Sequence, residues 1–149
     1  MKVLDWLTGT RGRSGPFAYL ATIVRAVTGV LFVTISTGKF VDHMHEVSDF
    51  KGYGIPIADI AVYVVGVVEL LCGLLLLVGL FTRLAALLLA CNMVGAIATA
   101  GLQEGGSFNL GVAPAMLVAM LFLLWAGCGA LAVDNRLDAG GRAQPALPD

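Results

Sequence analysis

The sequence predicts an all-α protein, a four-helix transmembrane bundle that runs up-down-up-down. Its 149 residues are 58% hydrophobic and 13% charged. The mean hydropathy is +0.90, far above that of a soluble domain of this size. Four apolar runs each come close to the roughly 20 residues that a spanning helix needs. These runs cover residues about 19–38, 57–80, 84–102 and 110–133.

Four spans in so short a chain leave no room for a second domain, so we expect residues 1–138 to form a single transmembrane domain. Residues 1–16 mix apolar and charged side chains and end at a Ser-Gly-Pro break, which indicates a short interfacial segment. A cleaved signal peptide is disfavoured because Arg25 interrupts the first apolar run. Residues 139–149 are predicted to be a disordered cytoplasmic tail.

Positive charges predict the orientation in the membrane. One side of the predicted bundle carries only Lys39 and Lys51. The other side carries six basic residues: Lys2, Arg11, Arg13, Arg83, Arg136 and Arg142. By the positive-inside rule both termini are cytoplasmic, and loops 39–56 and 103–109 face outward. The net charge of -1 gives no support for a nucleic-acid partner.

The second and third predicted helices are joined by a very short link. Gly79 is suited to end the second helix, and Thr82 is suited to cap the start of the third. Only two residues lie between them, so these helices are predicted to be antiparallel neighbours.

Polar residues gather on one face of three predicted helices. At 100° per residue the first helix places Arg25, Gly29, Phe32, Ser36, Lys39 and His43 in one sector. The third helix has a similar stripe of Ala85, Asn92, Ala96, Thr99 and Gln103. An ionisable residue at the centre of a span costs about 2.5 to 3.5 kcal/mol. We therefore expect an ion pair between Arg25 and Glu69, with Asn92 hydrogen-bonded to it.

Two interpretations of this triad stay open. It either locks the bundle or forms a proton-linked or quinone-linked site, since a carboxylate beside a base in a dry pocket can exchange a proton. In the functional interpretation Glu69 and Arg25 are the catalytic candidates. The candidates for binding a cofactor are Asn92, Lys39, His43 and Ser36.

A second cluster contains His43 and His45 together with Lys39, Asp42 and Glu46. A His-x-His pair can supply two metal ligands, but the further fixed ligands of a metal site are missing. Solvated loop residues and a contact to a quinone headgroup are the other interpretations, and no metal ligand is assigned. The three cysteines all lie in predicted spans without Cys-x-x-Cys spacing, so a structural disulfide is not expected.

The assembled motifs resemble those of the DoxX family of small four-span bacterial membrane proteins. They are Arg25 with Gly29, Gly38-Lys39-Phe40, Phe50 through Gly54-Ile55-Pro56, Glu69-x-x-x-Gly73, Gly79 with Thr82-Arg83, and Gly127-x-Gly129 before Asp134. One departure is Ala132-Val133, where Ser-Leu often precedes the aspartate. The resemblance implies a multi-pass protein of the bacterial plasma membrane. It also implies a link to thiosulfate:quinone electron transfer, as in the DoxD branch, or to redox-stress complexes.

The leading functional prediction is a membrane subunit of a redox-linked assembly that binds a diffusible quinone or a similar lipophilic molecule between its helices. The alternative is a non-catalytic scaffold of a larger membrane complex. Such a scaffold would meet a membrane-protein partner, or a second copy, along seams of small residues: Gly66, Gly73, Gly95 and Ala96. A small channel or transporter is disfavoured because so few polar residues enclose little water.

Overall fold

The computed structural model describes residues 16–101, 111–130, 132 and 133, and every regular element in this part is helical. In chain order the elements are α2 (Pro16–Val41), α3 (His43–Gly52), α4 (Ala58–Val78), α5 (Thr82–Ala96), the π-helix η1 (Ile97–Gly101) and α7 (Ala113–Ala126). The all-α prediction is confirmed for the described residues. The predicted interfacial segment up to residue 15, the whole second outer loop and the predicted tail lie outside them.

Three helical segments are long and apolar enough to cross a membrane: Pro16–Val41, Ala58–Val78 and Thr82–Thr99. They correspond to the first three predicted spans. In the described part of the fourth predicted span, the long α-helix is α7, whose 14 residues give about 21 Å of helix. Gly127 and Gly129 explain its early end, because both have positive φ angles (83° and 80°) that break the helix.

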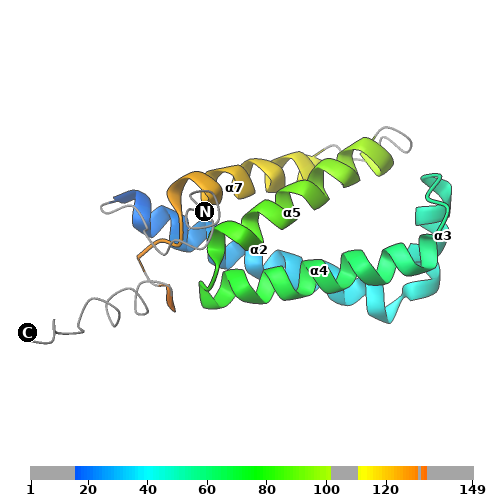
Figure 1. Cartoon of the computed structure of the whole chain (residues 1–149), viewed down its shortest axis with the longest axis horizontal. Coiled ribbons are helices and arrows are strands. Elements are labelled where there is room, and N and C mark those ends of the chain that lie inside the picture. Colours follow the sequence, from blue (N-terminus) through cyan, green and yellow to red (C-terminus); the bar gives the residue numbers. More distant parts are fainter. Residues whose placement is uncertain (1–15, 102–110, 131, 134–149) are drawn as a thin grey trace, which may run out of the picture.

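The long helices form two pairs, α2 with α4 and α5 with α7, which lie side by side along the longest axis (Figure 1). Further contacts of α4 with α5 and of α2 with α7 complete a ring. Helix α3 stands across one end of the bundle and packs on α4 (Figure 1). We call this end the open end and the opposite end, where α4 meets α5 at Gly79, the closed end.

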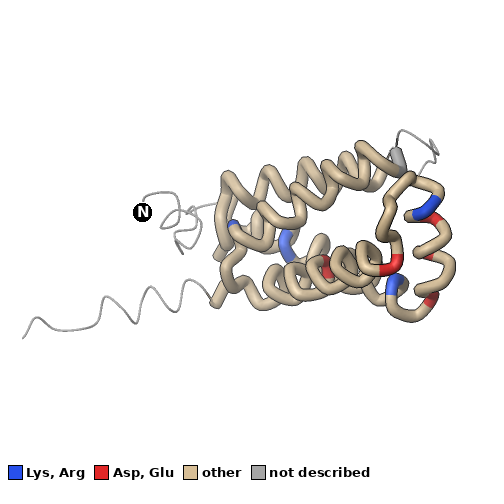
Figure 2. The backbone as a smooth tube through the Cα atoms, turned by 45° about the vertical axis from the view of Figure 1, so that its right-hand side comes forward, with Lys and Arg blue, Asp and Glu red and all other residues tan. Residues whose placement is uncertain are grey.

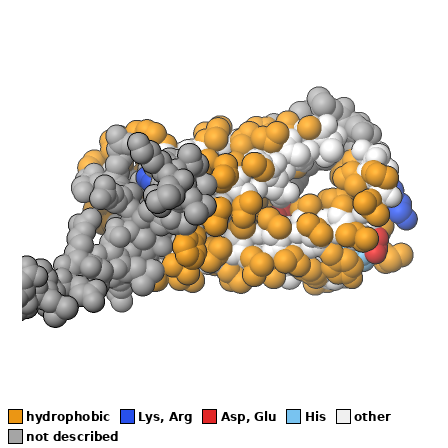
Figure 3. All heavy atoms as spheres, viewed as in Figure 1, with side chains coloured by type: hydrophobic (Ala, Val, Ile, Leu, Met, Phe, Trp, Pro, Cys, Tyr) orange, Lys and Arg blue, Asp and Glu red, His pale blue; other side chains and the backbone are white. Residues whose placement is uncertain are grey.

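Apolar side chains cover the outer walls of the helices, as expected for a surface that faces lipid (Figure 3). Most charged residues of the described part gather at the open end, on α3 and beside it (Figure 2). The interior is a continuous apolar core in which Phe32, Leu76, Leu89, Met120 and Leu123 are fully buried.

The link between α4 and α5 is as short as predicted. Gly79 ends α4 with a left-handed backbone (φ 76°), and its N–H donates to the Leu75 carbonyl at 2.8 Å. The predicted cap residue is off by one position. Phe81 occupies the N-cap with φ 49°, and Thr82 is already the first residue of α5.

Glycines allow α2 and α4 to approach closely. A Cβ atom on Gly73 would lie 3.1 Å from the Val33 side chain and 3.2 Å from the Gly29 carbonyl oxygen. Gly66 packs in the same way against Phe40 and Lys39. Gly66 and Gly73 are therefore buried inside the bundle, and the prediction that they form seams for a partner protein was wrong. The third glycine predicted on that seam, Gly95 of α5, is exposed.

The segment predicted as a polar outer loop, residues 39–56, is largely helical. Helix α2 runs on to Val41, three residues beyond the predicted end of the first span. Residues 43–52 then form α3, which was not predicted from the sequence. Val47 and Phe50, three residues apart on one face of α3, pack against Ala58 and Val62 of α4. That spacing was the available signal.

Candidate functional site: a buried ion pair in a cavity

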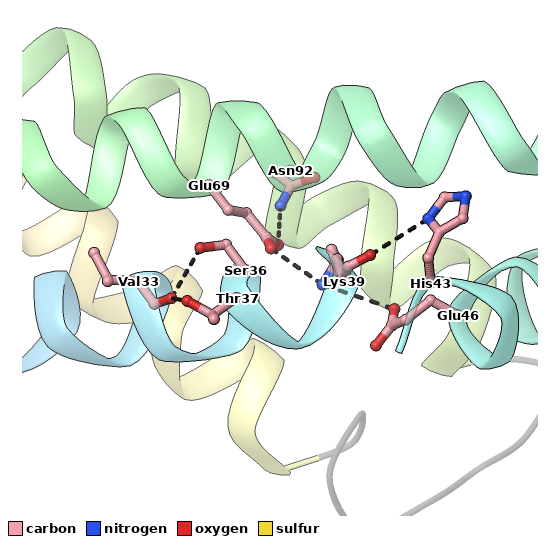
Figure 4. A network of polar contacts seen from close by, with 8 residues as sticks. All are labelled: Val33, Ser36, Thr37, Lys39, His43, Glu46, Glu69 and Asn92. Atoms are coloured by element: carbon pink, nitrogen blue, oxygen red, sulfur yellow. Dashed lines mark hydrogen bonds and ion pairs between the residues drawn. The ribbon is translucent and has the colours of Figure 1, made fainter. Parts of the chain in front are cut away.

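Glu69 of α4 lies at the centre of a polar cluster drawn from three helices. Its side chain is 4% exposed, and its Oε2 lies 3.1 Å from Nζ of Lys39 on α2. The Asn92 amide on α5 donates to Oε1 at 2.7 Å (Figure 4). The predicted hydrogen bond between Asn92 and Glu69 is confirmed. Both carboxylate oxygens are thus engaged, one by a cation and one by an amide.

The predicted ion pair between Arg25 and Glu69 was wrong. Arg25 is buried, as expected, but its guanidinium lies at the closed end, where a side chain on Gly79 would overlap it. Gly79 is ten residues beyond Glu69, about 15 Å along the helix axis. Lys39, which the sequence pattern had placed near the outer mouth, is the cation that meets Glu69.

The register of α2 against α4 explains the exchange of partners, because Gly29 lies opposite Gly73 and Lys39 lies against Gly66. Side-chain direction adds to this difference. Helical side chains lean toward the N-terminus of their own helix, and α2 and α4 are antiparallel. Arg25 on α2 therefore leans toward the closed end, while Glu69 on α4 leans toward the open end. Lys39 leans from the open end back into the bundle, where it meets Glu69. The register places Arg25 about two turns nearer the closed end than Glu69, and the opposite lean of the two side chains separates them further.

Most of the predicted stripe on the first helix does face the interior. Arg25, Gly29, Phe32, Ser36 and Lys39 are all buried. The hydroxyl of Ser36 donates to the Val33 carbonyl at 3.0 Å, within its own helix (Figure 4).

The ion pair borders a cavity of about 630 Å³ at the open end. All six helical elements contribute to its wall. The polar lining includes Lys39, Glu69 and Asn92 together with Glu46, Asp49, Tyr53 and Thr99. The apolar lining includes Phe32, Ile35, Val65, Met93 and Met116. Ser36 and His43 are not part of this wall.

Glu46 links the buried pair to the surface. Its Oε2 lies 4.0 Å from Lys39 Nζ, and its side chain is 31% exposed. The sequence pattern grouped Glu46 with a solvated histidine cluster and did not place it beside Glu69. Its position on the inner side of α3, one turn before Phe50, could be recognised only once α3 was known to be a helix.

His43 holds α3 against α4. Its Nε2 lies 2.9 Å from Oδ1 of Asp59, its Nδ1 lies 3.4 Å from the Lys39 carbonyl oxygen, and its ring stacks on Tyr63 at 4.1 Å between centroids. His45 points elsewhere and pairs with Asp49 at 3.2 Å. Among the described residues no three His, Cys, Asp or Glu side chains converge on a metal position.

The stripe predicted on the third helix reaches the cavity in its second half. Asn92, Ala96 and Thr99 line it, whereas Ala85 is buried in the apolar core. Gln103 lies outside the described residues. Cys91 is exposed and also lines the cavity, while Cys72 and Cys128 are buried, and none of these three cysteines forms a disulfide.

Comparison with known proteins gives a consistent set of relatives. The DoxX family model matches residues 20–102. A Mycobacterium tuberculosis protein named "Uncharacterized membrane protein Rv3486" is 38% identical over 129 residues, which cover 76% of this chain and 78% of the relative. A Bacillus subtilis protein named "Putative oxidoreductase CatD" is 30% identical over 112 residues, covering 75% and 82%. A Haemophilus influenzae protein is 33% identical, covering 79% and 90%.

No solved structure gives a significant match. The family model nevertheless spans more than half of the chain, from α2 through η1, and includes Lys39, Glu69 and Asn92. The relatives are bacterial, and one is named as a membrane protein, in agreement with the apolar outer walls described above. This chain is a multi-pass membrane protein and belongs to the DoxX family.

Proposed function

We propose that this protein is the membrane subunit of a redox-linked assembly and that it binds a quinone, or a similar lipophilic carbonyl compound, in the cavity beside Glu69. The observation that carries the proposal is a buried Lys39–Glu69 pair facing a cavity of about 630 Å³. That volume lies within the roughly 300–1,000 Å³ of small-molecule sites, which are mostly apolar with a few converging polar groups. The relative named as an oxidoreductase supports the redox assignment.

The residues present fit the headgroup of such a ligand. An ammonium group has three donors, so Lys39 can hold Glu69 and still donate to a carbonyl oxygen in the cavity. Asn92 fixes the orientation of the carboxylate through its bond to Oε1. A quinone, when bound, supplies two-electron redox chemistry, and the electrons come from a partner redox protein.

Glu69 serves as the proton-exchanging group in this proposal. It is the one carboxylate in the described spans that lies between a cation and an amide donor deep in the bundle. Lys39 and Glu46 continue from it toward the exposed end of α3, so a proton held at Glu69 has polar neighbours on the way to the surface. Arg25 stands outside this site, and we assign it to the packing of the closed end.

The proposal also includes four membrane crossings with both termini in the cytoplasm. Helix α7 is then the core of the fourth crossing, packed against α5 and α2. The bias of Lys and Arg toward the termini and Arg83 supports this orientation. It places α3, Lys39 and the cavity on the outer half of the membrane.

Equilibrium dialysis of duroquinone, a quinone without a side chain, against the purified protein in detergent micelles tests the binding site. Micelles without protein give the background. We expect saturable binding to the wild type and a loss of about tenfold or more in the double variant Lys39→Met/Glu69→Gln, since a hydrogen bond from a charged group contributes about 1.5–3 kcal/mol. The double change avoids leaving one buried charge alone.

The matched control is Lys51→Met, which removes a lysine of α3 that is exposed and lies outside the cavity wall. It is expected to bind duroquinone as the wild type does. Equal affinity in the wild type and the double variant would overturn the proposed site.

A further inference from the structure

The cavity reaches the outer wall of the bundle between α4 and α5. Cys91 and Gly95 of α5 line the cavity and are also exposed. Figure 3 shows the molecular surface hollowed between α4 and α5 beside α3, with an acidic side chain visible inside. Residues that belong both to the cavity wall and to the outer surface mark an opening.

Helix packing explains why the opening lies at this level. The bond between Asn92 and Glu69 bridges α5 and α4. Gly95 lies one turn further toward the open end, and a Cβ atom there would have nothing within 4 Å. At Gly73, by contrast, a Cβ atom would press on α2. The two helices therefore touch at Asn92 and separate at Gly95.

The wall around the opening is apolar. Every residue from 60 to 95 that is exposed has an apolar side chain, is Tyr63, or is glycine. Leu88 flanks the opening on α5 with an exposed fraction of 45%, and Val94, which is 54% exposed, lies outside the cavity wall. A surface of this kind faces hydrocarbon, so the opening leads into the bilayer.

We infer that the ligand enters sideways from the bilayer between α4 and α5, and that it is an amphipathic lipid with a single hydrocarbon chain. Its polar ring lies beside Lys39 and Glu69, and its chain leaves past Gly95 into the lipid. The inference rests on the proposed function and adds the class of ligand and the route. A molecule that crosses hydrocarbon needs no aqueous path to reach a buried ion pair.

The opposite edge offers a second route that the same experiment can separate. Thr34 and Gly38 of α2 are also exposed and also line the cavity. The α4–α5 edge is favoured because two of the three groups that hold the headgroup, Glu69 and Asn92, come from these helices. A chain attached to a ring at that position is nearest to the gap at Gly95.

The test compares duroquinone with decylubiquinone, which carries a ten-carbon chain, on the variants Gly95→Trp, Gly38→Trp and Val94→Trp. All three changes add an indole at an exposed position, and a Cβ atom on either glycine would have nothing within 4 Å. We expect Gly95→Trp to weaken decylubiquinone binding by about tenfold or more, because the indole fills the opening that the chain needs, and to weaken duroquinone binding far less. Val94→Trp should bind both quinones normally. Gly38→Trp should weaken decylubiquinone binding no more than it weakens duroquinone binding.

The possible results separate the lateral route, the class of ligand and the proposed function from one another. Equal binding of decylubiquinone to Gly95→Trp and to the wild type overturns the lateral route, and selective loss in Gly38→Trp moves the route to the α2 edge and overturns it as well. If the wild type binds neither quinone, the proposed function fails and this inference falls with it. If the wild type binds duroquinone but not decylubiquinone, the proposed quinone site is supported, and the inference that its ligand carries a hydrocarbon chain is overturned.

Cys91 provides a second readout that needs no substitution. It is the exposed thiol at the opening, and the buried Cys72 and Cys128 serve as internal references. Saturating decylubiquinone should slow alkylation of Cys91 by N-ethylmaleimide severalfold, measured by mass spectrometry, whereas duroquinone should not. Both quinone rings are fully substituted, so neither forms a thiol adduct that would imitate protection. An unchanged rate with bound decylubiquinone contradicts the route past Cys91.

Discussion

The closed and open ends of the bundle each bury one cation beside α4, with different results. At the closed end the Arg25 guanidinium fills the space over Gly79, and the helices pack tightly. At the open end Lys39 meets Glu69, and a cavity remains beside the pair. One cation completes the packing of its surroundings, and the other leaves room for a further molecule.

The difference comes from how the two helix pairs meet, because α2 and α4 stay close throughout. Gly29, Gly66 and Gly73 bring these helices together along most of their length. The pair α5–α7 approaches them at the closed end through the short link at Gly79. At the open end α3 lies across the bundle and contributes Glu46 and Asp49 to the cavity wall. The bundle is thus closely packed at the closed end and keeps a cavity at the open end.

The largest expected effect is at the open end, for Lys39→Met. Removing the cation leaves the Glu69 carboxylate buried without its counter-charge, so we expect a loss of roughly 3–5 kcal/mol in the free energy of unfolding. Titration of the micelle-bound protein with SDS measures it. Adding Glu69→Gln should recover most of the loss. Independent, additive losses would mean that the two side chains do not interact.

Next in size is Gly79→Ala at the closed end. The new methyl group would collide with the Arg25 guanidinium at a backbone φ of 76°, which adds strain to overpacking. We expect about 3 kcal/mol of destabilisation in the same titration. The matched control Gly38→Ala has open space around it and should be neutral or slightly stabilising. Equal destabilisation of Gly79→Ala and Gly38→Ala would mean that the closed end is not more tightly packed than the open end.

A smaller loss is expected for Asn92→Leu. It removes the hydrogen bond to Glu69 but leaves the ion pair with Lys39, so the stability should fall by about 1 kcal/mol. Duroquinone affinity should fall with it, since the carboxylate loses its orientation. Unfolding titration and dialysis on the same sample check both. A stability loss with unchanged affinity would restrict Asn92 to a structural role.

The smallest effect is predicted for Asp59→Asn, which weakens the attachment of α3. Asp59 is 71% exposed, so its pair with His43 contributes about 0.5 kcal/mol or less. Amide hydrogen exchange in α3 should become about twofold faster at nearly unchanged global stability. His45→Gln, which changes the more exposed histidine of α3, is the control. Unaltered exchange in Asp59→Asn would mean that apolar packing alone holds α3.

Much of the fold was accessible from local pattern. Three long helices, the break at Gly79 and the inward face of the first helix follow from apolar run length and a 100° period. Helix α3 was not predicted because the apolar face that packs on α4 consists of only two residues, Val47 and Phe50. The length of the fourth helix was overestimated because an apolar run does not reveal where glycines adopt positive φ.

The sequence by itself determined that this is a membrane protein with buried charges that must face one another, since lipid penalises each of them alone. It also identified Glu69 and Asn92 as neighbours. Only the tertiary structure decided which cation meets the carboxylate, because the register of α2 against α4 and the opposite lean of side chains on antiparallel helices separate Arg25 from Glu69 and bring Lys39 to it. That choice between Arg25 and Lys39 placed the ion pair at the open end, beside the cavity.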